Sequence, residues 1–416
     1  MKSNFLTASA AIRAGLTSEE LVADCLQRIA ARDGDIRAWA HVDPEHALAQ
    51  ARALDRMPRK GPLHGIPIGI KDVLDTADLP TGHGSTIYKG EISGRDANCV
   101  ATLRRAGAVI LGKTATTELA SPIPIGVRNP LDFTRTPGVS SSGSAAAVAD
   151  FMVPLALGTQ TGGSVIRPAT YCGIYGYKAS LNGMDRGGIR HMRPSLDTLG
   201  VMARSLEDIA LLRGSALFQD RPPRLGLCRT FEWPLAKPET HEALLSAAEK
   251  LRTAGAQVTE VVLPELFASA LETFKVIVLR ESALAYEREF RDHLHTMNDW
   301  LKDVAAKAVS VTNESYEKAL VHAAECRAHL SQVFRNIDAL ITPATAGEAS
   351  QKLTGLEDQT FCPLWTMMHG PCVTLPAFRG PNEMPMGLQV VGPVGGDDRL
   401  LAVAAWIEAA IHQEKA

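Results

Sequence analysis

The chain has 416 residues, of which 45% are hydrophobic and 21% are charged, as in an ordinary globular protein of one large or two medium domains. Its formal net charge of -3, without a block of lysine and arginine, argues against nucleic acid as a partner, because phosphate binding needs a concentrated basic face. No stretch approaches the roughly 18 apolar residues of a membrane span, so no membrane partner is expected either.

The first predicted elements are two helices. The segment 1–15 has a short apolar stretch that is interrupted by Arg13, which does not fit a signal peptide, and we expect a cytoplasmic protein. Thr17 and Glu20 form a capping-box pattern before apolar residues at helical spacing. Asp43, followed by proline, predicts the start of a second helix.

Strands and helices alternate in the next part of the chain. Gly65–Ile70 alternates and is rich in isoleucine, which predicts a strand that runs into Lys71. The sequence then predicts a helix over 97–106, a strand over 108–111, a small-residue helix over Ser144–Asp150 and a strand over Val153–Leu157.

The second half is predicted to be mostly helical from about residue 205 to residue 334, with amphipathic segments over Glu281–His295 and Tyr316–Phe334. The remaining predicted elements are a strand over Asp338–Thr342, apolar runs over Val373–Pro376 and Gly387–Val391, and a closing helix. Helices that alternate with apolar strands predict an α/β fold around a mixed sheet. Because no repeat or linker interrupts the pattern, we expect a single domain over 1–416.

The cysteines and histidines do not predict a metal site. Seven cysteines without a CxxC pair are typical of reduced, buried thiols. They are Cys25, Cys99, Cys172, Cys228, Cys326, Cys362 and Cys372. Neither they nor the twelve histidines fall at the spacing of metal ligands, so no metal is expected.

Residues 107–114, GAVILGKT, match the phosphate-loop pattern GxxxxGK[ST]. In a phosphate loop a strand precedes the first glycine, and the four variable positions form the loop that holds the phosphate. Here a helical segment precedes the glycine, and the variable positions, Ala-Val-Ile-Leu, are typical of a strand. The segment therefore predicts a turn and a strand that carries Lys113, without a phosphate site.

Two segments could supply a nucleophilic serine, SSSGS at 140–144 and GGS at 162–164, and neither contains a histidine. A triad with a distant histidine (His64, His83 or His369) stays open, because triads are defined by geometry and not by sequence order. SSSGS also fits a turn followed by a helix cap, since serine favours both.

The GGS segment is the better candidate for a reactive turn. It follows an apolar strand and precedes Pro168, which is tolerated only in the first turn of a helix. Ser164 is therefore expected at a helix N-terminus, where free backbone amides suit an oxyanion. A serine there needs a base, and Lys71, at the end of an apolar strand, is the best buried candidate.

Several ordered motifs resemble those of the amidase signature family, the serine amidohydrolases with a Ser-Ser-Lys triad. The motifs are GIPIGIKD (65–72), LGKTATTELA (111–120), NP (129–130), PGVSSSGSAAAV (137–148), GTQTGGSVIRPA (158–169), CGIYGYK (172–178), SLDTLG (195–200), PCVTLPA (371–377) and MPMGLQVVGP (384–393). The resemblance implies an α/β/α sandwich with a central mixed sheet flanked by helices. It divides the chain into a motif core at about 60–215, a variable helical segment at about 220–340, and closing strands and a helix at about 360–412.

The resemblance also implies roles for individual residues. Ser164 falls on the nucleophile, Ser140 on the bridging serine whose peptide bond is cis in the family, and Lys71 on the base. Ser141 would support the lysine. The oxyanion hole would consist of the backbone amides of Thr161, Gly162, Gly163 and Ser164.

This relay requires a neutral lysine. In the family, the lysine takes a proton from the bridging serine, which takes one from the nucleophile as an acyl-enzyme forms. A lysine with the ordinary pKa of about 10.4 is neutral less than about one time in a thousand at pH 7. Burial must therefore lower the pKa of Lys71 to roughly 7–8.

Three positions depart from the family pattern. Val139 replaces the second of two glycines before the first serine, and Gln160 replaces the usual aspartate. Arg167 lies three residues after Ser164 instead of two. The segment GTQTGGSVIRPA resembles the malonamidase branch, in which this arginine holds a substrate carboxylate, so Arg167 and Gln160 are candidate substrate-binding residues. A structural role for Arg167, paired with an internal acid, stays equally open.

The sequence thus predicts a cytoplasmic amidase that cleaves the C–N bond of a small amide through an acyl-enzyme on Ser164, with malonamate as a candidate substrate. The resemblance implies no cofactor, and it implies a homodimer. A carbamate, biuret-type or aryl-amide hydrolase with the same triad stays open. So do a binding protein with an inactive triad and a glutaminase-like amidotransferase subunit.

Overall fold

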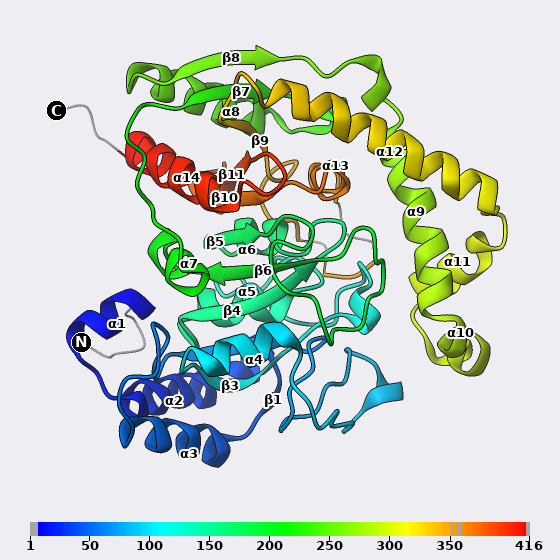
Figure 1. The fold of residues 1–416 in the computed structure, drawn as a ribbon. Coiled ribbons are helices and arrows are strands. Elements are labelled where there is room, and N and C mark those ends of the chain that lie inside the picture. The colour runs from blue at the N-terminus through cyan, green and yellow to red at the C-terminus, as the bar shows by residue number, and fades with distance from the viewer. Residues whose placement is uncertain (1–6, 352, 356–358, 413–416) are drawn as a thin grey trace.

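Eleven strands form one mixed sheet in the computed structural model, which describes residues 7–351, 353–355 and 359–412 (Figure 1). The strands are β1 (Trp39–Val42), β2 (Pro67–Lys71), β3 (Val109–Thr114), β4 (Leu155–Gln160), β5 (Tyr175–Lys178), β6 (Thr198–Ala203), β7 (Arg224–Cys228), β8 (Gln257–Val261), β9 (Ala339–Pro343), β10 (Cys372–Arg379) and β11 (Pro385–Val391). Their order in the sheet is β1-β3-β2-β4-β6-β5-β10-β11-β9-β7-β8. Of the segment tested for a signal peptide, residues 1–6 lie outside the described residues.

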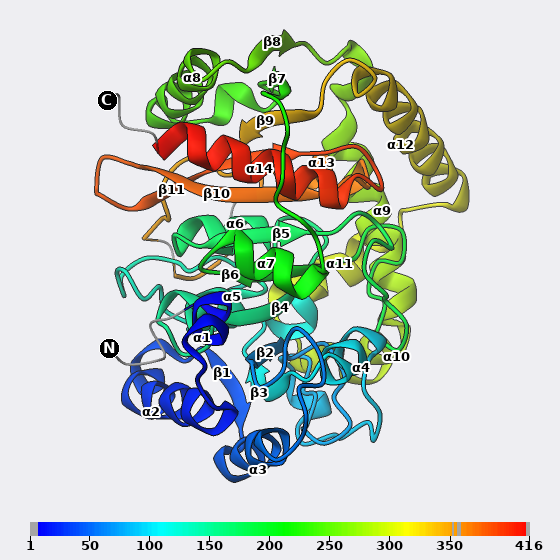
Figure 2. The same ribbon diagram turned by 60° about the vertical axis from the view of Figure 1, so that its left-hand side comes forward.

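Helices flank the sheet, which confirms the predicted α/β architecture (Figures 1 and 2). They are α1 (Ala8–Ala14), α2 (Ser18–Ile36), α3 (Pro44–Asp55), α4 (Asn98–Arg105), α5 (Ser142–Ala149), α6 (Ile166–Tyr171), α7 (Leu206–Arg213), α8 (Pro238–Thr253), α9 (Ala270–Ala285), α10 (Glu287–His293), α11 (Asp299–Ala308), α12 (Asn313–Val333), α13 (Pro363–Met367) and α14 (Asp397–His412). The predicted capping box at Thr17 and Glu20 is present at the start of α2.

Parallel strands bring the motif-bearing segments to one edge of the sheet. β2 lies between β3 and β4 and is parallel to both, so the carboxyl ends of these three strands face the same way. The other neighbours in this half of the sheet, β1 with β3 and β4 with β6, are antiparallel. Lys71, the last residue of β2, therefore lies beside the segment that follows β4.

The small residues of α5 allow this helix to pack directly against the strands. Residues 142–148 are all buried, and the helix contacts β2, β3 and β4. At Gly143 an added Cβ would lie 2.4 Å from the Ala115 nitrogen and 2.4 Å from the Ala38 carbonyl oxygen, so no larger residue fits. The serine cluster at the start of α5 is thereby held against the ends of the parallel strands.

The prediction of a mostly helical segment after residue 205 was partly wrong, because β7 and β8 lie within it. β7 is a five-residue strand with a central glycine, Gly226, which gives a weak strand signal. That glycine is required by packing, since an added Cβ would lie 2.7 Å from atoms of Leu340 and Val261. β8 has largely polar, exposed residues because it forms the edge of the sheet.

The amphipathic segment Glu281–His295 is likewise not one helix. α9 ends at Ala285 and α10 begins at Glu287, with Tyr286 between them. The Tyr286 side chain is fully buried, and its hydroxyl donates to the Leu119 carbonyl oxygen at 2.9 Å. This contact with a segment far away in the sequence fixes the break, and helical periodicity does not reveal it.

The remaining sequence expectations concern thiols and membrane spans. All seven cysteines are buried free thiols, as predicted. Across the described part of the chain, no helix has the length and apolar character needed to cross a bilayer.

Candidate active site

Lys71 is a buried lysine at the end of a fully buried strand. Every residue of β2 is buried, because β3 and β4 cover its two edges and helices cover its faces. The Lys71 side chain is fully inaccessible to solvent. Its Nζ donates to Ser140 Oγ at 2.7 Å and to Thr159 Oγ1 at 2.8 Å. The structure thus brings the predicted lysine and the predicted bridging serine into direct contact.

The Ser140 segment has the backbone conformation that the resemblance implied. The Val139–Ser140 peptide bond is cis. Ser140 and Ser141 are both buried. Ser141 Oγ donates to the Thr159 carbonyl oxygen at 3.1 Å and accepts from the Thr159 amide at 3.3 Å. Ser141 therefore acts on Lys71 indirectly, through the threonine that the lysine contacts.

Thr159 is a contact of Lys71 that the sequence reasoning missed. Its strand, β4, pairs with β2 so that Leu157 lies opposite Ile70. Two residues further along, Thr159 therefore faces the end of β2. The alternation of side-chain directions along β4 places Thr159 on the same face as Leu157. The contact with Lys71 could be predicted from this only if β2 and β4 were known to be neighbours.

Ser164 lies in the turn between β4 and α6, as predicted, and is half-buried. Among the described residues, its side chain forms no hydrogen bond with Ser140. The backbone amides of Gly162, Gly163 and Ser164 also form no hydrogen bond with a described residue. Catalytic hydrogen bonds are often loose without substrate, so this geometry is compatible with a nucleophile and an oxyanion hole.

The two glycines of the turn lie close against the segment that covers it. An added Cβ at Gly162 would lie 1.9 Å from Gln359 Oε1. At Gly163 it would lie 3.0 Å from Cys362 Cβ. A side chain at position 162 would displace the end of the Gln359 side chain, and one at position 163 would press against Cys362.

Both the oxygen and the nitrogen of the Gln160 side-chain amide form hydrogen bonds within the protein. Its Oε1 accepts hydrogen bonds from the backbone amides of Val165 at 2.9 Å and Ile166 at 3.0 Å. Its Nε2 donates to Thr366 Oγ1 at 3.1 Å. The side chain is buried, and these bonds hold the N-terminus of α6. Its candidate role in substrate binding stays a prediction.

Arg167 is also directed toward the protein. It is 2% exposed, and its Nη2 donates to the Val139 carbonyl oxygen at 2.8 Å. This bond ties α6 to the backbone just before Ser140. The contact favours the structural role that the sequence left open, while the position of Arg167 three residues after Ser164 keeps it near the turn.

Burial lowers the pKa of Lys71 to about 7. Two nearby charges act in opposite directions on this pKa, which Asp197 raises and Arg193 lowers. A lysine with this pKa is neutral in about half of the molecules at pH 7. The structure therefore meets the requirement for a lysine base that the sequence posed.

Asp197 links the turn before Ser164 to a neighbouring loop, a contact that sequence reasoning missed. Its carboxylate accepts a hydrogen bond from the Thr161 hydroxyl. The other oxygen accepts from the backbone amides of Met192 at 2.9 Å and Arg193 at 2.8 Å. Asp197 lies within the motif SLDTLG, which marked the segment but not this contact.

The other sequence candidates lie outside this cluster. Lys113 Nζ donates to Thr81 Oγ1 at 2.5 Å and lies 3.5 Å from a carboxylate oxygen of Asp72, on a strand without a phosphate loop. His64 accepts from the Lys60 amide at 3.0 Å, and His369 contacts the Ser195 carbonyl oxygen at 2.8 Å. Neither histidine bonds to a serine side chain of the two serine segments among the described residues.

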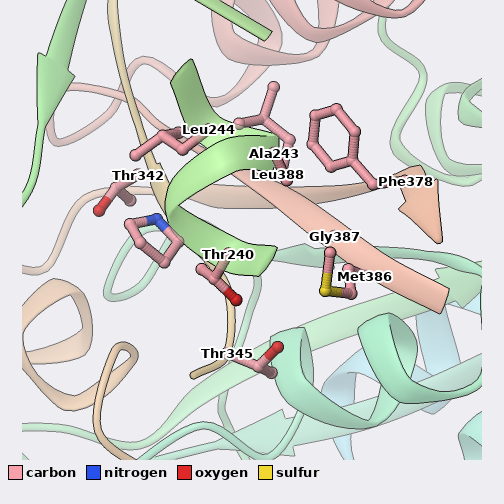
Figure 3. Close-up of a pocket in the computed structure, with 10 residues that line it drawn as sticks. Thr240, Ala243, Leu244, Thr342, Thr345, Phe378, Met386, Gly387 and Leu388 are labelled. Carbon is pink, nitrogen blue, oxygen red and sulfur yellow. The ribbon is translucent and has the colours of Figure 1, made fainter. Parts of the chain in front are cut away.

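Of two cavities in the described part of the chain, one adjoins the serine segment and the other lies away from the Lys71 cluster. A cavity of about 320 Å³ lies beside the serine cluster and includes Gly138 and Ser142 in its lining. A second cavity, of about 10 Å³, lies between α8, β9, β10 and β11 (Figure 3). Figure 3 shows Thr240, Phe378 and Met386 around it, and no residue of the Lys71 cluster. Its volume suits a single water molecule, so we assign it no function.

Comparison with known proteins agrees with this geometry. The chain matches the Amidase family model over residues 20–221 and 212–401. A glutamyl-tRNA(Gln) amidotransferase subunit from Thermobifida fusca is 32% identical, with 97% of this chain and 95% of that protein covered. The corresponding protein of Chloroflexus aggregans is 34% identical, with 96% and 95% covered.

Solved structures are similar across the whole chain. One crystal structure of an amidase has a TM-score of 0.88 at 29% identity and covers 97% of this chain and 98% of its own. The peptide amidase from Stenotrophomonas maltophilia has a TM-score of 0.81 at 29% identity and covers 98% and 96%. The family match and the near-complete relatives show that the chain belongs to the Amidase family and is an amide C–N hydrolase.

Proposed function

We propose that the chain is a serine amidohydrolase in which Ser164 is the nucleophile, Ser140 relays its proton and Lys71 is the base. The observation that carries this proposal is the 2.7 Å hydrogen bond from Lys71 Nζ to Ser140 Oγ, made by a buried lysine. A lysine in this position can accept the proton of Ser140 once it is neutral, and its pKa of about 7 makes the neutral form available.

The reaction begins when Ser164 Oγ attacks the carbonyl carbon of the amide. The Ser164 proton passes to Ser140, and the Ser140 proton passes to Lys71. When the C–N bond breaks, the relay runs backwards and protonates the leaving amine, which leaves an acyl ester on Ser164. Water, deprotonated by the same relay, then hydrolyses the ester to a carboxylic acid and free Ser164.

The turn before Ser164 supplies the electrostatic part of the mechanism. Negative charge develops on the carbonyl oxygen during attack, and preorganised amides stabilise it. The proposed donors are the backbone amides of Gly162, Gly163 and Ser164, and Thr161 belongs to the same turn. The Thr161 hydroxyl is held by Asp197, which fixes the orientation of the turn.

For the substrate we propose a small amide that carries a carboxylate, such as malonamate. The likeness of GTQTGGSVIRPA to the malonamidase branch supports this choice. Arg167, which belongs to this segment, supplies a positive charge near the turn. A carbamate or aryl amide would use the same three side chains. The homodimer implied by the resemblance is a separate proposal, and sedimentation of the purified chain tests it.

A glutaminase-like component of an amidotransferase is the second candidate. Relatives that are 32% and 34% identical over nearly the whole chain are glutamyl-tRNA(Gln) amidotransferase subunits. Such a protein would release ammonia from glutamine for a partner protein. A small-molecule amidase would instead act on small amides as the purified chain alone.

Ammonia release by the purified chain tests the proposal. We expect hydrolysis of malonamate, malonamide or propionamide, and loss of at least about a thousandfold in kcat in Ser164→Ala, because the acyl-enzyme cannot form. Ser142→Ala, which alters a serine of the same cluster, is the matched control and should keep most of the activity. Hydrolysis of glutamine only, or full activity in Ser164→Ala, would contradict the proposal.

A further inference from the structure

Arg193 is a buried cation whose side chain pairs with no carboxylate among the described residues. It is 2% exposed, and its Nε donates to Ser282 Oγ at 2.9 Å. Its Nη2 is also buried and has no hydrogen-bond partner in the described chain. A buried guanidinium without a counter-ion is costly for the folded state, so an anionic partner is the usual compensation.

Two acids adjoin residues that Arg193 contacts, and the side chains of both are engaged by other groups. Asp197 binds the backbone amide of Arg193 and the Thr161 hydroxyl. Glu281, the neighbour of Ser282 on α9, accepts from the Ser195 hydroxyl at 2.6 Å and from the Tyr316 hydroxyl at 2.8 Å. Neither carboxylate forms a hydrogen bond with the terminal nitrogen Nη2 of Arg193.

Aromatic rings hold the Arg193 guanidinium in place. Its central carbon lies 5.6 Å from the ring centroid of Tyr286 and 5.6 Å from that of Trp300. Arg190 lies over the same Tyr286 ring at 5.7 Å, but it forms an ion pair with Glu289. The two arginines thus share their surroundings and differ in whether they have an acid partner.

This cluster lies beside the proposed reacting groups. Asp197 joins the backbone of Arg193 to the oxyanion turn at Thr161. On the other side, the Tyr286 hydroxyl bonds to the Leu119 carbonyl oxygen, in the loop that follows β3. β3 ends at Thr114, which is directly opposite Lys71 in the sheet. Arg193 therefore lies between two segments that leave the sheet next to Lys71.

A second unpartnered polar atom lies in the same region. His83 is 8% exposed, and its Nδ1 has no hydrogen-bond partner among the described residues. Its carbonyl oxygen accepts from the Leu119 amide at 2.9 Å, and its ring lies edge-on to Tyr88. Both unsatisfied groups belong to residues connected to Leu119, His83 directly through its carbonyl oxygen and Arg193 through the Tyr286 ring.

We propose that Arg193 binds the carboxylate of the substrate, so that the enzyme selects small amides with a free carboxylate. This inference rests on the proposed function and assigns the carboxylate to Arg193 in place of Arg167. A planar guanidinium matches a carboxylate with two parallel hydrogen bonds, and the rings keep it oriented. Because only 2% of Arg193 is exposed, the proposal requires the side chains around it to rearrange when the substrate binds.

The first test compares two substrates in kinetic assays. We expect Arg193→Met to lower the ratio of kcat/KM for malonamate to that for propionamide roughly 10- to 100-fold, the loss expected for a charge-assisted hydrogen bond. The assays are run on the alkaline plateau of each variant's own pH–rate profile, so that protonation of Lys71 does not affect the comparison. Arg190→Lys, over the same ring but paired with Glu289, should leave the ratio unchanged.

The second test measures binding without turnover. In full-length Ser164→Ala protein, malonate should raise the melting temperature. The double variant with Arg193→Met should show no malonate-induced shift, and the double variant with Arg193→Lys should retain part of it. Methionine has a similar volume and no charge, so Arg193→Met should fold with equal or higher stability in the absence of ligand. Destabilisation by Arg193→Met without a change in malonate binding would show that the arginine is structural.

The outcomes separate this inference from the proposed function. An unchanged substrate ratio in Arg193→Met, or a selective loss of malonamate turnover only in Arg167→Met, would overturn the assignment to Arg193 while leaving the serine mechanism intact. Absence of hydrolysis of every amide would overturn the proposed function, and the malonate measurement would still decide whether Arg193 binds a carboxylate.

Discussion

At the scale of single residues, the site depends on a lysine whose environment favours the neutral form. Lys71 is buried at a strand end and bonded to neutral partners, the hydroxyl groups of Ser140 and Thr159. Its contact with Ser140 was predictable, because the motifs that carry both residues are specific. Thr159 and Asp197 were not predictable, because their roles depend on which strands and loops are neighbours in space.

The lysine predicts a particular pH profile. For propionamide, kcat/KM should rise with pH through about 7, because the base is active only when the pKa of Lys71 has been exceeded. The charges that act on Lys71 are those of Asp197 and Arg193. Arg193→Met removes the cation that lowers the pKa, so its acidic limb should move to higher pH.

Rate measurements between pH 5 and pH 10 on the purified enzyme check this profile, and Arg190→Lys is the control for a nearby charge. An acidic limb that stays in place when Arg193 is replaced would mean that this arginine does not act on the base. A flat profile from pH 5 to pH 9 would remove Lys71 from the proposed role.

At the scale of elements, α6 and its preceding turn form the most tightly specified part of the site. The sequence predicted the turn at Gly162–Ser164 from the glycines and Pro168. It did not predict that Gln160 would close the N-terminus of the helix, because a glutamine has no fixed positional preference of this kind. Strands β7 and β8 escaped prediction for a related reason, since their pairing depends on distant segments.

Replacement of Gln160 tests the role of this cap. Gln160→Ala removes two hydrogen bonds to backbone amides and should lower the free energy of unfolding by about 1–3 kcal/mol. Thr366→Val removes the bond to Gln160 Nε2 and a longer bond, of 3.5 Å, to the Cys362 carbonyl oxygen, and it should cost about 1 kcal/mol. Urea unfolding of the purified proteins gives both values.

The kinetic consequence follows from the same cap. Because the turn positions the proposed oxyanion donors, Gln160→Ala should also reduce kcat for propionamide more than it raises KM. A loss that appears only in KM would indicate that Gln160 contacts the substrate, as the sequence first suggested.

At the scale of the whole molecule, the sheet gathers residues that are far apart in the chain. The sequence predicted a mixed sheet flanked by helices, and the structure confirms it with one sheet that extends from β1 to β8. The segment with α9 to α11 contains none of the motifs that carried the sequence resemblance, but it contributes Ser282, Tyr286 and Trp300 to the surroundings of Arg193. The proposed carboxylate site therefore draws part of its surroundings from a segment that contains none of the sequence motifs.

The most direct test of the central claim is covalent labelling of the nucleophile. A fluorophosphonate should form one adduct with the wild-type protein, and peptide mass spectrometry should locate it on Ser164. Ser140→Ala and Lys71→Met should label far more slowly, because the proton of Ser164 then has no relay. An adduct on another serine, or undiminished labelling of Ser164→Ala, would contradict the account.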